Sequence, residues 1–164
     1  MKKLTLITAL LICLVICLNA CTSYRDDVAA RDIAPTALES LSTVGGFTAL
    51  DDLFLSLEFS NPELIESDVS DWVIYSSSST TSVDEFGIFH VKADGDLDAV
   101  KAEVTAYVEA TQVKLQVFLE KYEPAETTKL ENAQVFVYGN YVVYTILLDE
   151  DTAAVKTAVQ DALK

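Results

Sequence analysis

The chain has 164 residues and a formal net charge of −15, from 26 acidic and 11 basic side chains. This length suits one folded domain with its own core and is too short for two of ordinary size. Nucleic-acid binding is not expected, because phosphate contacts need a basic face and the Lys and Arg residues do not cluster into one. We interpret the acidic surplus as a means of keeping the protein soluble and of repelling it electrostatically from anionic membrane surfaces. Attraction of divalent cations or of a basic partner is the alternative.

The first twenty residues are typical of a bacterial lipoprotein signal peptide. Two lysines precede an apolar run over residues 4–18, and the sequence LNA leads into Cys21. Cys13 and Cys17 each follow a bulky isoleucine, whereas Cys21 follows the small residue that a signal peptidase requires. We therefore expect residues 1–20 to be removed and Cys21 to carry a lipid. An uncleaved membrane-spanning segment is the alternative, and it also places the domain outside the cell membrane.

Loss of this leader sets the chemistry available to the mature chain. No thiol remains for a disulfide or a metal, because Cys21 itself would be bonded to diacylglycerol. That diacylglycerol is the only attached group we expect, and no cofactor is predicted. Residues 21–31 are polar and lack apolar periodicity, which indicates a tether to a single domain over residues 32–164.

Two helices are predicted at the start of the domain. Asp32 is expected to cap the first, and the pair Gly45 and Gly46 to end it. A second, shorter helix is expected to begin near Thr48, with Asp51 three residues on as a capping-box variant.

Two strand-strand-helix units follow, which predicts an α+β fold with a four-stranded, mostly antiparallel sheet. In the first unit, strands over residues 72–75 and 85–92 are joined by a Ser/Thr run over residues 76–82, interpreted as a mobile hairpin loop. Apolar residues then recur at spacings of three and four, which predicts a long amphipathic helix from Leu97 to Lys121.

The second unit contains the clearest turn signal in the chain. Strands over residues 133–138 and 141–148 are joined by a Gly-Asn pair, which favours a two-residue hairpin. A terminal helix follows, with Asp149 or Asp151 as its expected cap.

This hairpin register divides the side chains between two faces of the sheet. The aliphatic face, with Val135, Val137 and Val142, is expected to receive both the long helix and the terminal helix. The other face is aromatic, and it is either covered by the N-terminal helices or open as a contact surface for a ligand or an envelope protein. The candidate contact residues are Phe136, Tyr138 and Tyr141.

Several segments considered together suggest a family. They are the leader, an N-terminal helix, the strands DWVIY and DEFGIFHVK, the long helix, and the hairpin LENAQVFVYGNYVVYTI. This layout resembles a family of bacterial lipoproteins described only as a domain of unknown function, DUF4358, and the likeness runs from about Ile33 to Ala162. The resemblance implies a cell-surface or periplasmic lipoprotein with no assigned activity, and it transfers no site residues.

Catalysis is not expected from the side chains present. The one histidine, His90, shares a strand face with Phe86 and Ile88, which is typical of a structural residue. A Ser-His-Asp site would need a serine from the Ser/Thr loop, and no Gly-x-Ser-x-Gly motif occurs. Asp84 and Glu85 are interpreted as the solvated start of a strand, with side chains on opposite faces. An uncharacterised hydrolase is our last hypothesis.

One acidic triplet has part of the pattern of a metal site. Asp94, Asp96 and Asp98 alternate like the first half of a calcium loop, but Ala99 and Thr105 occupy the positions that need glycine and glutamate. Turn formation and the acid preference of a helix N-terminus explain the triplet. A weak cation-responsive module is the alternative function.

The sequence therefore predicts a lipid-anchored protein on the extracytoplasmic face of the cell membrane. Its domain is expected to be a non-catalytic binding or scaffolding module. An envelope protein or polymer is the expected partner.

Overall fold

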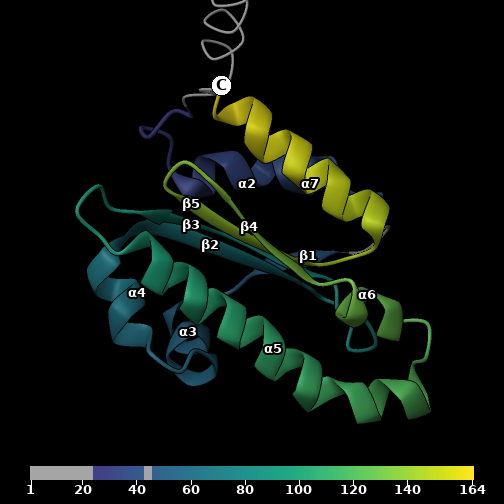
Figure 1. Cartoon of the computed structure of the whole chain (residues 1–164). Helices are drawn as coiled ribbons and strands as arrows, with labels where there is room; N and C mark the ends of the chain where they lie inside the picture. The colour runs from purple at the N-terminus through teal and green to yellow at the C-terminus, as the bar shows by residue number, and fades with distance from the viewer. Residues whose placement is uncertain (1–23, 43–45) are drawn as a thin grey trace, which may run out of the picture.

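The structure is a computed structural model, and it describes residues 24–42 and 46–164. Cys21 and Gly45 lie outside these residues. An antiparallel sheet with the order β1-β2-β3-β5-β4 lies between two layers of helices (Figure 1). The strands are β1 (Phe47–Ala49), β2 (Val69–Ser77), β3 (Glu85–Val91), β4 (Gln134–Tyr138) and β5 (Tyr141–Ile146). The helices are α2 (Ala30–Glu39), α3 (Asp52–Glu58), α4 (Pro62–Asp68), α5 (Leu97–Tyr122), α6 (Thr127–Glu131) and α7 (Asp149–Ala162).

The α+β class is confirmed, but the described sheet has five strands where the sequence predicted four. The additional strand, β1, pairs with the end of β2 through Thr48↔Ser76 and Phe47↔Ser77. Part of the Ser/Thr run is thus strand rather than loop, because its backbone pairs with β1 even though it contains no apolar side chain. Helix α3 consequently begins later than expected, and Asp51 caps it by accepting from the Phe54 N–H at 3.2 Å.

The boundaries of the first helix also differ from those expected. Helix α2 begins at Ala30, so Asp32 lies in the first turn and does not cap it. The helix ends at Glu39, before the expected glycine pair, and its buried face includes Ala34 and Ala37. These small residues let α2 lie close against α7, which it contacts.

The long helix and the hairpin are confirmed. Helix α5 has 26 residues, or about 39 Å at 1.5 Å per residue. The β4–β5 register is the predicted one, with Tyr138 opposite Tyr141 and Phe136 opposite Val143. At the start of α7, however, neither expected aspartate acts as the cap, since the N-cap position is Leu148.

Each face of the sheet carries its own core (Figure 1). The aliphatic face packs against α5 as expected, together with residues of α3 and α4. The terminal helix does not join it there, because α7 lies with α2 on the aromatic face. Val155 and Val159 of α7 are both fully buried, and with the alanines of α2 they form a flat layer of small side chains over large rings.

Candidate functional site

The aromatic residues proposed as a contact surface are largely inside the domain. Tyr141 is 0% exposed and Tyr138 is 8% exposed, while Phe136 is half-buried. The Tyr141 hydroxyl donates to the Val28 carbonyl at 2.7 Å and accepts from the Val28 N–H at 3.3 Å. Of the two alternatives for this face, the covered one holds at Tyr138 and Tyr141, because α2, α7 and the chain before α2 lie over these rings.

The described part of the expected tether packs against the domain. The Tyr24 ring lies against Tyr138, with centroids 5.4 Å apart. The Asp26 carboxylate accepts from the Asn140 amide at 3.0 Å and lies 2.9 Å from His90 Nε2. The chain is thus attached to the hairpin before α2 begins, and the single histidine takes part in that attachment.

The acidic triplet lies in the turn before α5 and in the first turn of that helix. The Asp96 carboxylate caps the helix by accepting from the Ala99 N–H at 2.9 Å, and its own N–H donates to Asp68 at 2.8 Å. Asp98 lies in the first turn, and Asp94 in the preceding turn. In the part of the chain that the structure describes, no three His, Cys, Asp or Glu side chains gather as metal ligands.

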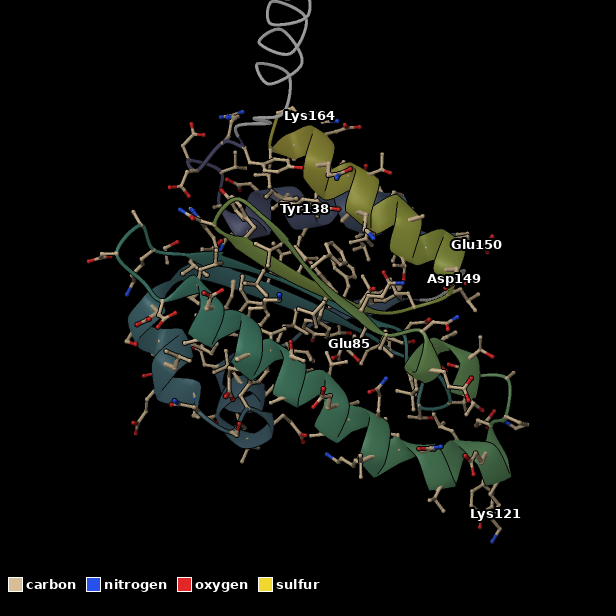
Figure 2. The ribbon with its side chains drawn as sticks, in the orientation of Figure 1. Glu85, Lys121, Tyr138, Asp149, Glu150 and Lys164 are labelled. Atoms are coloured by element: carbon tan, nitrogen blue, oxygen red, sulfur yellow. The ribbon has the colours of Figure 1, made fainter. Side chains whose placement is uncertain are left out.

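A buried carboxyl group at the start of β3 is the strongest chemical feature of the described residues. Glu85 is 8% exposed, so the expectation of a solvated strand start is wrong. Its Oε1 accepts from the Tyr107 hydroxyl at 2.6 Å and from the Tyr144 hydroxyl at 2.7 Å. Figure 2 shows Glu85 between the sheet and α5, while Tyr138 lies on the other side of the sheet. Helix α5 covers this strand end and supplies one of the two phenols.

The neighbouring acid, Asp84, is also buried but has a different partner. It is 1% exposed, and its Oδ1 lies 2.8 Å from the ammonium of Lys129. That ammonium also contacts Glu126 at 3.0 Å. This ion cluster attaches the β2–β3 loop to α6.

Gly87 makes room for one of the two phenols. It pairs with Tyr144 across β3 and β5, and a Cβ at this position would lie 2.3 Å from the tyrosine ring. A glycine inside a strand commonly marks such a close approach. The missing side chain therefore lets the Tyr144 ring lie directly against β3 at this position, where its hydroxyl reaches Glu85.

Burial controls the ionisation of these groups. Desolvation raises the pKa of the Glu85 carboxyl above its ordinary value, against the opposing effect of hydrogen bonds from Tyr107, Tyr144 and Ser76. Burial, followed by the charge of Glu85, also raises the pKa of both phenols. Both tyrosines thus remain hydrogen-bond donors. None of the ion pairs among the described residues includes Glu85, so its carboxyl group has no ion-pair partner among them.

A cavity of about 160 Å³ adjoins Glu85, and we call it the Glu85 cavity. Its walls come from α3, α5 and the start of β3, and they consist of Phe54, Glu58, Glu85, Tyr107, Thr111, Lys114 and Leu115. Lys114 and Glu58 are paired at 2.9 Å and are both more exposed than Glu85. Two larger hollows, of about 280 and 320 Å³, have no buried ionisable side chain on their walls.

Sequence reasoning missed this site although its parts were visible. Tyr107 falls on the inward stripe of the predicted long helix, and Tyr144 on the face predicted to meet that helix. The missing element was the position of Glu85 along β3, which brings it under the same turn of α5. A single acid before an apolar strand does not reveal that position.

The fold and site define a class: an antiparallel α+β domain with a buried carboxyl group beside a small cavity. None of the helices in residues 24–42 and 46–164 is long and apolar enough to cross a membrane. The profile of the family described as "Domain of unknown function (DUF4358)" matches residues 62–147, slightly more than half of the chain. The chain therefore belongs to the DUF4358 family, as its motifs indicated, although the match is shorter than the expected likeness. No curated protein and no solved structure matched the chain.

The matched segment includes the main parts of the site. It begins with α4 and extends through β5 to residue 147, so it contains Glu85, Tyr107 and Tyr144. The segments that cover the aromatic face, α2 and α7, lie outside the match, as does α3.

Proposed function

We propose that this chain is a lipoprotein anchored through Cys21 on the extracytoplasmic face of the cell membrane. We further propose that its domain is a non-catalytic binding module with the Glu85 cavity as its ligand site. The ligand is a small molecule or a small group on an envelope polymer. The observation that carries the binding proposal is Glu85 itself, a 92% buried carboxyl group without a cationic partner at the wall of a cavity.

The construction of the Glu85 cavity supports a binding role. Ligand sites combine apolar walls with a few fixed polar groups, and Phe54 and Leu115 supply such walls here. Two hydrogen bonds from α5 and β5 hold the Glu85 carboxyl in place, so its position is set before a ligand arrives. A fixed polar group loses little conformational entropy on binding.

The anchor proposal is supported by the leader and by the attachment of the chain after it. The lipobox sequence ends at Cys21, and Tyr24 already contacts the hairpin. The domain would then be held close to the bilayer by the end that carries the β4–β5 turn.

Metabolic labelling with a clickable fatty acid tests the anchor. Cys21→Ala should abolish the label and leave the precursor unprocessed, whereas Cys17→Ala should change neither. Undiminished labelling of the Cys21 variant would contradict the anchor, whatever the cavity binds.

Filling the cavity tests the binding site. Thr111→Phe places a ring into the Glu85 cavity from α5, and Ala110→Phe, which adds the same ring at the next and exposed position, is the control. In ligand-observed NMR with a library of small fragments, the wild type and the Ala110 variant should retain the same binders. The Thr111 variant should lose them. Equal binding by all three proteins, or by none, would rule out this cavity as the site.

A further inference from the structure

We propose that the Glu85 cavity selects a small organic cation, namely a primary or substituted ammonium group on a short apolar body. This inference rests on the proposed binding function and adds the chemical class of the ligand.

The first step concerns charge. A buried carboxylate strongly favours a nearby cation, because low-dielectric surroundings leave its charge poorly solvated. Glu85 accepts hydrogen bonds from neutral phenols and lacks an ion-pair partner in the described residues. An ammonium group in the cavity would supply that missing positive charge.

The second step concerns the aromatic walls. Phe54 meets Tyr107 edge to face at 6.0 Å, and Tyr107 is also stacked on Phe59 at 4.5 Å. Of these rings, Phe54 and Tyr107 line the cavity together with Glu85. Ring faces attract organic cations, and the attraction increases when the site is shielded from water. The walls therefore favour a cation with carbon attached over a hydrated metal ion.

The third step concerns the rim of the cavity. The Lys114 ammonium lies 2.9 Å from Glu58, so one carboxylate of the cavity already holds an ammonium. The Lys114–Glu58 pair is neutral, so ionisation of Glu85 gives the walls a net negative charge, on a chain whose formal net charge is −15. The field of the domain therefore attracts cations and repels organic anions.

The fourth step concerns size. The cavity is partly open to solvent, and its volume of about 160 Å³ is similar to the roughly 150 Å³ of an enclosed apolar cavity that holds one benzene molecule. Benzylamine, benzyl alcohol and benzoate place a cation, a neutral group and an anion on the same ring. They form a matched set of probes for this site.

The experiment measures the dissociation constants of the three probes by NMR titration of the soluble domain at pH 7. Benzylamine should bind about fivefold more tightly than benzyl alcohol, because a hydrogen bond to a charged group is worth about 1 kcal/mol more than a neutral one. Benzoate should bind most weakly.

Two variants sharpen the test in opposite directions. Glu85→Gln keeps an oxygen acceptor for both phenols, and it should remove most of the preference for benzylamine. Lys114→Gln removes the competing ammonium, and it should tighten benzylamine binding severalfold. Glu109→Gln, an exposed change of equal charge on α5, should alter neither value.

The outcomes separate this inference from the proposed function. If benzyl alcohol or benzoate binds as tightly as benzylamine or more tightly, and Thr111→Phe abolishes that binding, the preference for a cation is wrong. The Glu85 cavity would still be the binding site. If Glu85→Gln leaves benzylamine binding unchanged, the proposal that Glu85 selects a cation is also wrong. Failure of all three probes, together with a fragment library that finds no binder, would overturn the binding function itself.

Discussion

The two faces of the sheet are covered by different kinds of side chain. On the aromatic face, α2 and α7 place small residues over the rings of β3 and β5. On the face that meets α5, the buried groups include Glu85, Glu103 and Lys129. Among the described residues, Asp151 is the buried ionisable group on α7, where it accepts from Ser42 at 2.6 Å near the helix start.

This contrast suggests that one face mainly stabilises the fold and that the other carries the function. The face under α2 and α7 is a tightly packed apolar layer that also fixes the chain before α2, so its residues contribute mainly to the free energy of folding. The face under α5 has buried ionisable groups and a cavity, and both features lower the stability of the fold. Proteins commonly carry such costs at functional sites. We therefore place function on the α5 face.

The largest expected effect tests the packed face. Tyr141→Ala removes a fully buried ring together with both hydrogen bonds to Val28, and should lower the free energy of unfolding by about 5 kcal/mol. Tyr122→Ala, at a tyrosine that is 57% exposed, should change it by less than about 1 kcal/mol. Urea denaturation measures both. A small effect at Tyr141 would reopen the contact-surface hypothesis.

The next effect tests the buried charges under the other face. Lys129→Met leaves the Asp84 carboxylate buried without its cation and should cost about 3 kcal/mol. Lys164→Met breaks an exposed ion pair with Asp161 and should cost less than about 1 kcal/mol. Equal losses in the two variants would show that burial does not raise the cost of removing the cation from Asp84.

A smaller effect tests how Glu85 is held. Gly87→Ala pushes a methyl group into the Tyr144 ring, and should cost about 1–3 kcal/mol while moving that hydroxyl away from Glu85. Gly46→Ala meets nothing nearer than 3.4 Å and serves as the control. The stability loss comes from denaturation, and the hydroxyl shift from a crystal structure of the variant. An unmoved Tyr144 would contradict the role assigned to Gly87.

The smallest effect is a pH dependence. Burial raises the pKa of Glu85 above its ordinary value of 4.5 in the folded state, so folding favours its protonated form relative to the unfolded chain. The stability of the wild type relative to Glu85→Gln should therefore be greatest below about pH 4.5. It should fall as the pH rises through the folded-state pKa. Urea unfolding from pH 4 to 8 measures this difference, with Glu109→Gln as the control; a difference that grew with pH would reverse the assignment.

Local signals explain what could be predicted from the sequence. The Gly-Asn turn determined the β4–β5 register, and regular apolar spacing determined α5, because each is encoded in neighbouring residues. Strand β1 was missed because its three residues become a strand only when the end of β2 is beside them. The side of the sheet taken by α7 was also missed, since it depends on the alanines of α2, more than a hundred residues earlier.

The site shows the same limit more strongly. Glu85, Tyr107 and Tyr144 lie on three elements, and only the folded chain brings their oxygens within hydrogen-bond distance. The triplet at Asp94, Asp96 and Asp98 is visible in the sequence because its residues lie close together along the chain, but Asp96 caps a helix.

Crystals of the protein soaked with a fragment library give the most direct test of a ligand site under α5. The expected result is bound fragments in contact with Glu85, Phe54 and Thr111, with amines among them. Fragments that collect in the larger hollow between α5 and α6, with the Glu85 cavity left empty throughout, would contradict it.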